Sequence, residues 1–329
     1  MSSLRTRLIS FLTAYHLALA RVAIGVFLVI HYLQMVPYAA ALYSRNGVLP
    51  LAALNPAHRW APTPFAYLDS PVVVTSVTAL LVLLALAYTV GYWTRTAALL
   101  LWGGAYALFH RNELTLNPSL PFLGLWLLAH LFHAADPPAS VDRWWATRRG
   151  TARGWSALPL DVWNLLWWVS ALAYAYSAVT KLVSPSWWSG QALRLLLTSP
   201  IARPNALVHG LVALPASCLA MLTYGVVAME LLYLPLSSFR RFRPGLWLVL
   251  VGLHVGLLAT LDLADISLAM VVFHLGTFDP RWLTGMSATR KVHQTVWTRF
   301  AARILASLVT RGARSSSAVA TIKRSAGSP

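Results

Sequence analysis

The sequence contains very few acidic residues, and this scarcity excludes an ordinary soluble protein. Among its 329 residues only nine are Asp or Glu, and the only two glutamates are Glu113 and Glu230. Charged residues make up 11% of the chain, whereas a soluble domain carries roughly 25%. Hydrophobic residues make up 58%, and the mean hydropathy is +0.62. We therefore predict a polytopic membrane protein.

Cysteine and lysine are also scarce. The chain has a single cysteine, Cys218, which excludes an internal disulfide. Cysteine usage therefore does not indicate whether the compartment is oxidising or reducing. The chain has 23 arginines and 3 lysines, a preference typical of a GC-rich bacterial genome, and Lys181 is the only lysine before the last forty residues. Arginine stays protonated, whereas lysine can lose its proton and act as a base. Lys181, in "SAVTKLVSPSWWSG", is therefore a candidate functional residue; alternatively, its ammonium group simply reaches the membrane–water interface.

Long apolar stretches are abundant, and eight of them predict membrane spans. A spanning helix needs about 20 mostly apolar residues. The stretches therefore predict an all-α transmembrane bundle, in which Pro215 kinks the sixth span. The first stretch is too long for a cleavable signal peptide. The eight predicted spans are 15–37, 71–90, 96–110, 118–134, 159–180, 206–235, 245–262 and 264–279.

The positive charges predict the orientation of these spans. With the N-terminus inside, the inner segments hold 19 Lys and Arg residues and the outer segments hold 6, while Arg21 lies within the first span. Because cytoplasmic loops collect positive residues, we expect a protein of the bacterial inner membrane with both termini on the cytoplasmic side. Lys181 then lies near the outer face. The net charge of +17 belongs to loops and tail, so no nucleic-acid partner is expected.

The organisation of the chain follows from this pattern. Residues 15–283 form the predicted membrane domain. Residues 284–310 predict a basic amphipathic helix that lies on anionic membrane lipids. Residues 311–329 are basic and predicted to be disordered.

Ionisable residues inside the spans are costly and usually mark function. A histidine there can also be a neutral group bonded to a carbonyl. Arg21 lies too deep to reach the interface, so we expect a structural ion pair with Glu230. The triplet His130, His133 and Asp136 has a spacing that could bind a metal, but membrane di-iron enzymes need several such clusters, so no metal is expected. The full set of candidates is Arg21, His31, His110, His130, His133, Lys181, His209, Glu230, His254 and His274.

Four stretches resemble one family, the horizontally transferred transmembrane domain shared by vitamin K-dependent gamma-carboxylases and many bacterial proteins. The resemblance extends over roughly residues 15–283, and the stretches follow one another in the order that the family shows. They are "ARVAIGVFLVIHYLQMVPYAAALYSRNGVLP", "GYWTRTAALLLWGGAYALFHRNELTLN", "SAVTKLVSPSWWSGQAL" and "AMELLYLPLSSFRRFRPGLWLVLVGLHVGLLATL". The family positions that they match are Arg21, Gly25, Tyr43, Ser44, Gly47, Pro50, Gly91, Arg95, His110, Asn112, Lys181, Leu182, Trp187, Gly190, Glu230, Leu231 and His254.

The resemblance implies a chemistry. In the carboxylases, the lysine at the position of Lys181 removes a proton from vitamin K hydroquinone, and the histidine at the position of His110 assists. The deprotonated hydroquinone then reacts with oxygen to give a strong base. This base removes a proton from a glutamyl side chain, and the resulting carbanion attacks carbon dioxide. A carboxylase- or quinone-epoxidase-like lyase with a quinone cofactor is thus the leading hypothesis. The cofactor-binding candidates are Asn112, Arg21, Glu230, His254 and Trp187.

Two other functions stay open. Short bacterial members of the family resemble an integral-membrane partner that matures a sporulation-delaying peptide toxin. The chain ends soon after the last predicted span, and Thr180 stands where the carboxylases have a second lysine. A non-catalytic membrane factor for maturation of, or immunity to, a secreted peptide encoded nearby is therefore the alternative. A small transporter would show an inverted repeat, and the sequence shows none.

Overall fold

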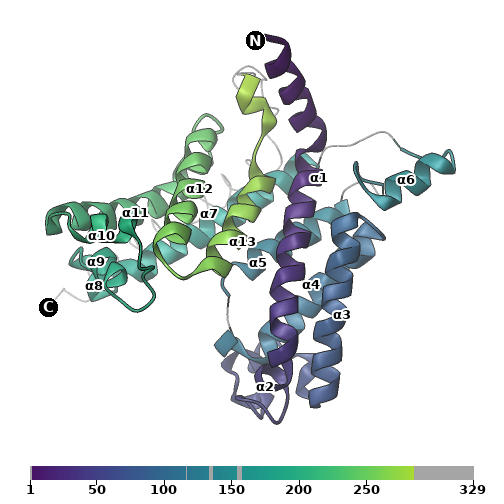
Figure 1. Ribbon diagram of the computed structural model, residues 1–329, viewed down its shortest axis with the longest axis horizontal. Helices are drawn as coiled ribbons and strands as arrows, with labels where there is room; N and C mark the ends of the chain where they lie inside the picture. Colours follow the sequence, from purple (N-terminus) through teal and green to yellow (C-terminus); the bar gives the residue numbers. More distant parts are fainter. Residues whose placement is uncertain (1, 116, 133–135, 154–157, 285–329) are drawn as a thin grey trace, which may run out of the picture. The chain divides into compact units, whose positions relative to one another are not determined.

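The structure is a computed structural model that describes residues 2–115, 117–132, 136–153 and 158–284 (Figure 1). The chain divides into two units, residues 1–285 and 286–329. Every regular element in the described ranges is a helix, which confirms the all-α prediction; the β-pairing there is an isolated bridge between Ala202 and Leu261. The predicted interfacial helix at 284–310 and the tail at 311–329 lie outside the described residues, apart from Thr284.

The long helices coincide with the predicted spans. They are α1 (Ser2–Met35), α3 (Pro71–Val90), α4 (Thr94–Arg111), α5 (Leu120–Ala129), α7 (Leu160–Leu182), α11 (Ala216–Ser237), α12 (Arg243–Thr260) and α13 (Ala264–Thr277). The shorter α-helices are α2 (Ala39–Tyr43), α6 (Val141–Arg148), α8 (Pro185–Trp188), α9 (Ala192–Leu197) and α10 (Ala206–Val212). Single 3₁₀ turns occupy several of the connections, including η5 (Glu113–Thr115).

Among the described residues, four helical stretches are both long and apolar enough to cross a membrane. Helices α4 and α7 are as long but less apolar, and α5 and α13 are shorter. The four stretches indicate a membrane-embedded protein, while the count of eight spans and the orientation stay predictions. The four stretches are Tyr15–Tyr43, Pro71–Val90, Ala216–Ser237 and Arg243–Thr260.

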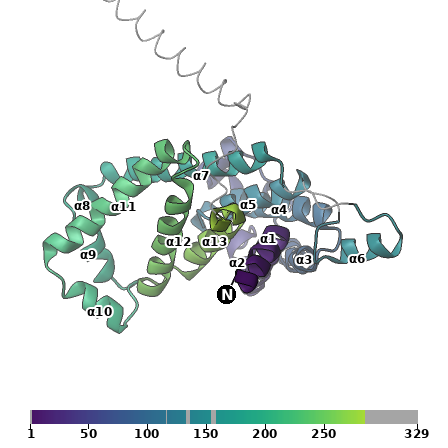
Figure 2. The same ribbon diagram turned by 90° about the horizontal axis from the view of Figure 1, so that it is seen from above.

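The predicted kink in the sixth span is a full break. Helix α10 ends at Val212, and α11 begins at Ala216, directly after Pro215. Proline has no N–H to donate and disfavours helical backbone in the residue before it. A helix that continued through Leu214 would therefore lose stability. The break leaves α11 as a 22-residue helix that packs along α7 (Figures 1 and 2).

Three helix packings position the candidate residues. Helix α1 lies against α3 and α13, and α7 lies against α11. At the α1–α3 crossing, a Cβ on Gly25 would come within 2.8 Å of the Thr89 backbone, so only glycine fits there. At the α5–α13 crossing, Gly276 leaves room for the indole of Trp126 in the same way.

The turn between α3 and α4 is fixed by a carboxylate from another segment. Asp142, in the first turn of α6, accepts hydrogen bonds from the backbone N–H groups of Trp93 and Thr94, both at 2.9 Å, and from the Thr94 hydroxyl at 2.7 Å. The first N–H groups of a helix have no partner within it, so Asp142 takes the place of an N-cap. Gly91 ends α3 in the left-handed conformation, with φ at 72°.

Candidate functional site

Lys181 and Glu230 form a half-buried ion pair between α7 and α11. The Lys181 Nζ lies 2.8 Å from Oε1 and 2.7 Å from Oε2 of Glu230. The Glu230 side chain is 6% exposed and that of Lys181 is 18% exposed. Lys181 also donates to the Ser177 hydroxyl at 2.6 Å. The three oxygens use all three N–H bonds of an ammonium group.

The local sequence explains why the lysine lies there. Ser177 precedes Lys181 by four residues on α7, so both side chains share one face of the helix. Helix α7 ends just after Lys181, and the chain turns through α8 with Pro185 at its first position. The turn is held against α11 by the Tyr224 hydroxyl, which donates to the carbonyl of Trp188 at 3.1 Å.

Trp187 completes the surroundings of the lysine. The Lys181 Nζ lies 5.1 Å from the centroid of the Trp187 ring, within the range of a cation–π interaction. Gly190 closes the turn with φ at 74°, and a Cβ there would press on Ala220 and Tyr224. Three predicted site residues, Lys181, Glu230 and Trp187, are therefore brought together, although the sequence did not indicate that the first two are bonded.

The expected ion pair between Arg21 and Glu230 is wrong. Both carboxylate oxygens of Glu230 accept from Lys181, whereas Arg21 Nη2 donates to the carbonyl of Ala139 at 2.5 Å. Arg21 is 1% exposed and lies against Gly91, where a Cβ would come within 2.8 Å of Nη1. Arg21 thus supports the junction between α1 and the loop that follows α5, apart from the lysine site.

His110 and Asn112, at the end of α4, belong to a different cluster. The ring of His110 lies 4.3 Å from that of Tyr106, and its carbonyl accepts from Asn55 at 2.9 Å. Asn112 donates to the carbonyl of Leu42 at 2.6 Å and thereby ties α4 to α2. These contacts share no residue with those of Lys181. The structure therefore separates the two residues that the resemblance pairs.

His254 joins a second buried cluster on the same face of α7 as the lysine. The Tyr174 hydroxyl lies 2.7 Å from His254 Nε2 and 3.1 Å from His274 Nε2. All three side chains are buried. Tyr174 and Lys181 are seven residues apart on α7, which is about 10 Å at 1.5 Å per residue. The sequence singled out both histidines but gave no signal for the tyrosine.

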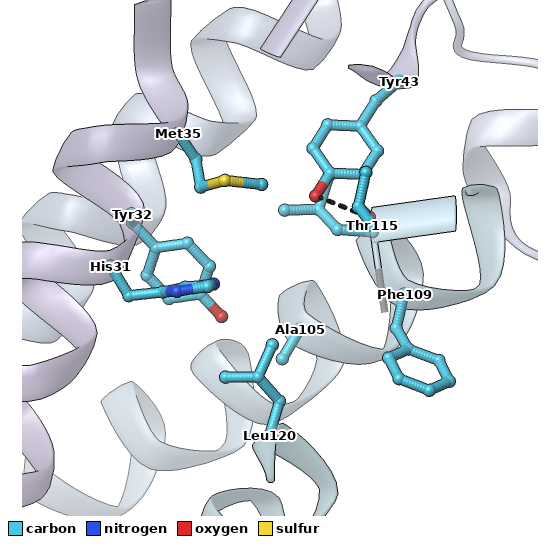
Figure 3. Close-up of a pocket in the computed structure, with 9 residues that line it drawn as sticks. His31, Tyr32, Met35, Tyr43, Ala105, Phe109, Thr115 and Leu120 are labelled. Atoms are coloured by element: carbon cyan, nitrogen blue, oxygen red, sulfur yellow. Dashed lines mark hydrogen bonds between the residues drawn. The ribbon is translucent and has the colours of Figure 1, made fainter. Parts of the chain in front are cut away.

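A pocket near the end of α4 was not predicted. In Figure 3 the Tyr32 hydroxyl and the His31 ring point toward it from α1. His31 Nδ1 also lies 3.3 Å from the carboxylate of Asp265, which accepts from Asn117. The sequence analysis singled out His31 as an ionisable residue within a span, but it gave no signal for its contact with Asp265. The lining residues are His31, Tyr32, Met35, Tyr43, Ala105, Leu108, Phe109, Thr115 and Leu120.

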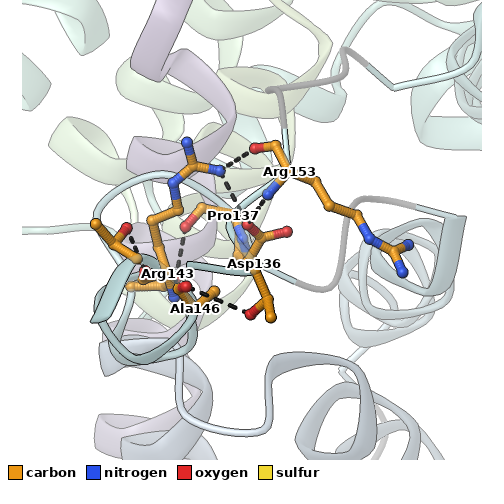
Figure 4. Close-up of polar contacts among 8 residues, drawn as sticks. Asp136, Pro137, Arg143, Ala146 and Arg153 are labelled. Atoms are coloured by element: carbon orange, nitrogen blue, oxygen red, sulfur yellow. Dashed lines mark hydrogen bonds and ion pairs between the residues drawn. The ribbon is translucent and has the colours of Figure 1, made fainter. Parts of the chain in front are cut away.

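Two members of the triplet considered for a metal, His130 and Asp136, contact other groups. His130 Nδ1 lies 2.8 Å from the carbonyl of Trp126 and 3.0 Å from the Tyr88 hydroxyl. Asp136 accepts from Arg143 at 2.9 Å and from the backbone N–H of Arg153 at 3.0 Å (Figure 4). His133 lies outside the described residues. No group of three metal-binding side chains occurs in the described ranges.

Comparison with known proteins gives no relative for this chain. No family model, no curated protein and no solved structure matches it.

Proposed function

We propose that this integral membrane protein uses the Lys181–Glu230 pair to take a proton from a small, planar hydroxylated molecule. The observation that supports this is the contact of the Lys181 Nζ with both oxygens of a buried carboxylate, beside an indole ring. Following the resemblance, the molecule is a hydroquinone, and the class of protein is carboxylase-like. The hydroquinone supplies an acidic O–H group, and oxygen is the oxidant that reacts with it.

The pair can present a neutral amine as the base, with no buried charge before the substrate gives up its proton. When one proton moves from Lys181 to Glu230, the result is a neutral amine and a neutral carboxylic acid. In surroundings of low dielectric, two neutral groups avoid the desolvation cost of two ions. The amine lone pair then accepts the proton of the O–H group, Lys181 becomes an ammonium again, and the negative charge stays on the substrate oxygen beside it.

Two residues beside the lysine support the proposal of a planar substrate. Trp187 offers a flat apolar face next to the amine, and it is only half-buried. Ser177 can hold one N–H bond of Lys181 and so direct its lone pair. His254, Asn112 and Arg21 do not contact this group, so we do not include them in the proposed site.

The alternative is a non-catalytic membrane factor for maturation of, or immunity to, a secreted peptide. Two observations favour it. All three N–H bonds of Lys181 are used within the protein, and His110 lies in a separate cluster. In this case the ion pair is purely structural and joins α7 to α11.

Binding at the lysine distinguishes the two functions, because the chain has only three lysines. With ¹⁵N-lysine-labelled protein in lipid nanodiscs, we expect reduced menadione to shift the signal of Lys181. The signals of Lys291 and Lys323, in the tail, are internal controls and should stay in place. An unchanged Lys181 signal at saturating hydroquinone would contradict the proposal and favour the peptide factor.

A further inference from the structure

The cluster of Tyr174, His254 and His274 contains one hydroxyl between two imidazoles. Tyr174 comes from α7, His254 from α12 and His274 from α13, so the cluster joins three helices. The two imidazole centroids lie 6.0 Å apart. A hydroxyl has a single proton, so it can donate to only one of the two Nε2 atoms and must accept from the other. The two histidines therefore carry their Nε2 protons unequally.

The bonds around His274 decide which histidine accepts. The Thr277 hydroxyl donates to the carbonyl of His274 at 3.1 Å. Its oxygen is then available to accept from His274 Nδ1, which lies 3.4 Å away. With the proton on Nδ1, the Nε2 of His274 accepts from Tyr174, and Tyr174 accepts from the Nε2–H of His254.

This assignment leaves one open position. His254 Nδ1 is then a lone pair, and it is buried with no hydrogen-bond partner among the described residues. The whole His254 residue is 6% exposed. The three hydrogen bonds of this cluster all donate in one direction, away from that lone pair: from His254 to Tyr174, from Tyr174 to His274, and from His274 to Thr277.

We propose that these three residues form a buried proton relay, with its entry at His254 Nδ1 and its end at His274. A proton that binds His254 Nδ1 releases the proton of Nε2 to the Tyr174 oxygen. Tyr174 passes its own proton to His274 Nε2. His254 becomes neutral with its proton on Nδ1, His274 becomes an imidazolium, and the number of protons and the total charge are conserved. The relay does not depend on a catalytic role for Lys181.

Nitrogen NMR of ¹⁵N-histidine-labelled protein in nanodiscs tests the relay. Single His254→Asn and His274→Asn variants assign the signals. At pH 8 we expect the Nε2–H form for His254 and the Nδ1–H form for His274. On acidification we expect the added proton to charge His274 while His254 switches to the Nδ1–H form.

Tyr174→Phe should abolish this switch, because the hydroxyl between the rings is lost. Tyr176→Phe is the matched control, since Tyr176 lies two residues away on α7 and is 71% exposed. Tautomers that stay fixed over the whole pH range, or a charge that appears on His254 in the unmodified protein, would overturn the relay. If Tyr174→Phe does not fold, the change of the histidine tautomers with pH in the unmodified protein is itself the test of the relay.

Discussion

At the scale of single residues, the Lys181–Glu230 contact is a buried ion pair that joins α7 to α11. Its carboxylate is more buried than its ammonium group, so Glu230 cannot return to water without a change in the α7–α11 packing. Removal of one partner from a buried pair leaves an unpaired charge, whereas removal of both can be nearly neutral. The pair should therefore behave as a unit in mutational experiments.

A double-mutant cycle measures this coupling. We expect Lys181→Met or Glu230→Gln alone to lower the free energy of unfolding, with the loss of a buried partner costing about 3–5 kcal/mol. The double variant should recover much of the loss. Thermal unfolding in detergent, followed by circular dichroism, measures each step. Additive losses would show that the two groups do not depend on each other.

The sequence singled out Arg21 and Glu230 as buried ionisable residues but did not predict their partners. The depth of Arg21 and of Glu230 within their spans could be judged from sequence, and each needed a partner of opposite charge. Depth does not say which helices lie side by side. Because α11 packs along α7, Glu230 meets Lys181, and Arg21 meets a carbonyl instead.

At the scale of elements, apolar runs and prolines predicted the helices closely. Helix α3 was predicted at 71–90 and occupies Pro71–Val90, because Ser70 caps its start and Gly91 ends it. The break at Pro215 was expected only as a kink. The Tyr174 cluster and the pocket beside Tyr32 could not be predicted, since each joins side chains from helices far apart in the sequence.

The α1–α3 crossing should depend on its glycine. We expect Gly25→Ala to destabilise the protein by about 1–3 kcal/mol, because the added methyl group must displace Thr89. Gly103→Ala on α4 is the control: nothing lies within 4 Å of the new Cβ. Alanine is a better helix former, so this change should be neutral or stabilising by up to about 1 kcal/mol. Equal effects of the two changes on the unfolding temperature would argue against close packing at Gly25.

The carboxylate at the start of α4 should act as a cap. Asp142→Ala removes three hydrogen bonds to Trp93 and Thr94, and loss of such a cap costs about 1–2 kcal/mol. Asp161→Ala serves for comparison, because Asp161 is exposed in the first turn of α7. We expect that change to stay within about 0.5 kcal/mol in the same unfolding experiment. A harmless Asp142→Ala would show that the turn is held by other contacts.

At the scale of the whole molecule, the orientation in the membrane follows from charge and can be tested directly. With Cys218 replaced by serine, a cysteine at Ser189 should react with an impermeant thiol reagent added to intact cells. A cysteine at Ser238, beyond the opposite end of α11, should react only after the membrane is opened. Both positions are exposed in the structure. Reaction of Ser238→Cys alone in intact cells would invert the predicted topology.

The proposal that Lys181 acts as a base is tested most directly by the rate of oxygen uptake with reduced menadione. We predict that Lys181→Arg in nanodiscs lowers this rate by about 100-fold or more, the range expected for a lost proton-transfer group. Arginine can keep the bond to Glu230 but cannot give up its proton. Arg203→Lys, in an exposed pair with Asp262, should stay within about twofold of the unmodified protein. A Lys181→Arg protein that is folded and as active as the unmodified one would contradict the account and leave the lysine a structural partner of Glu230.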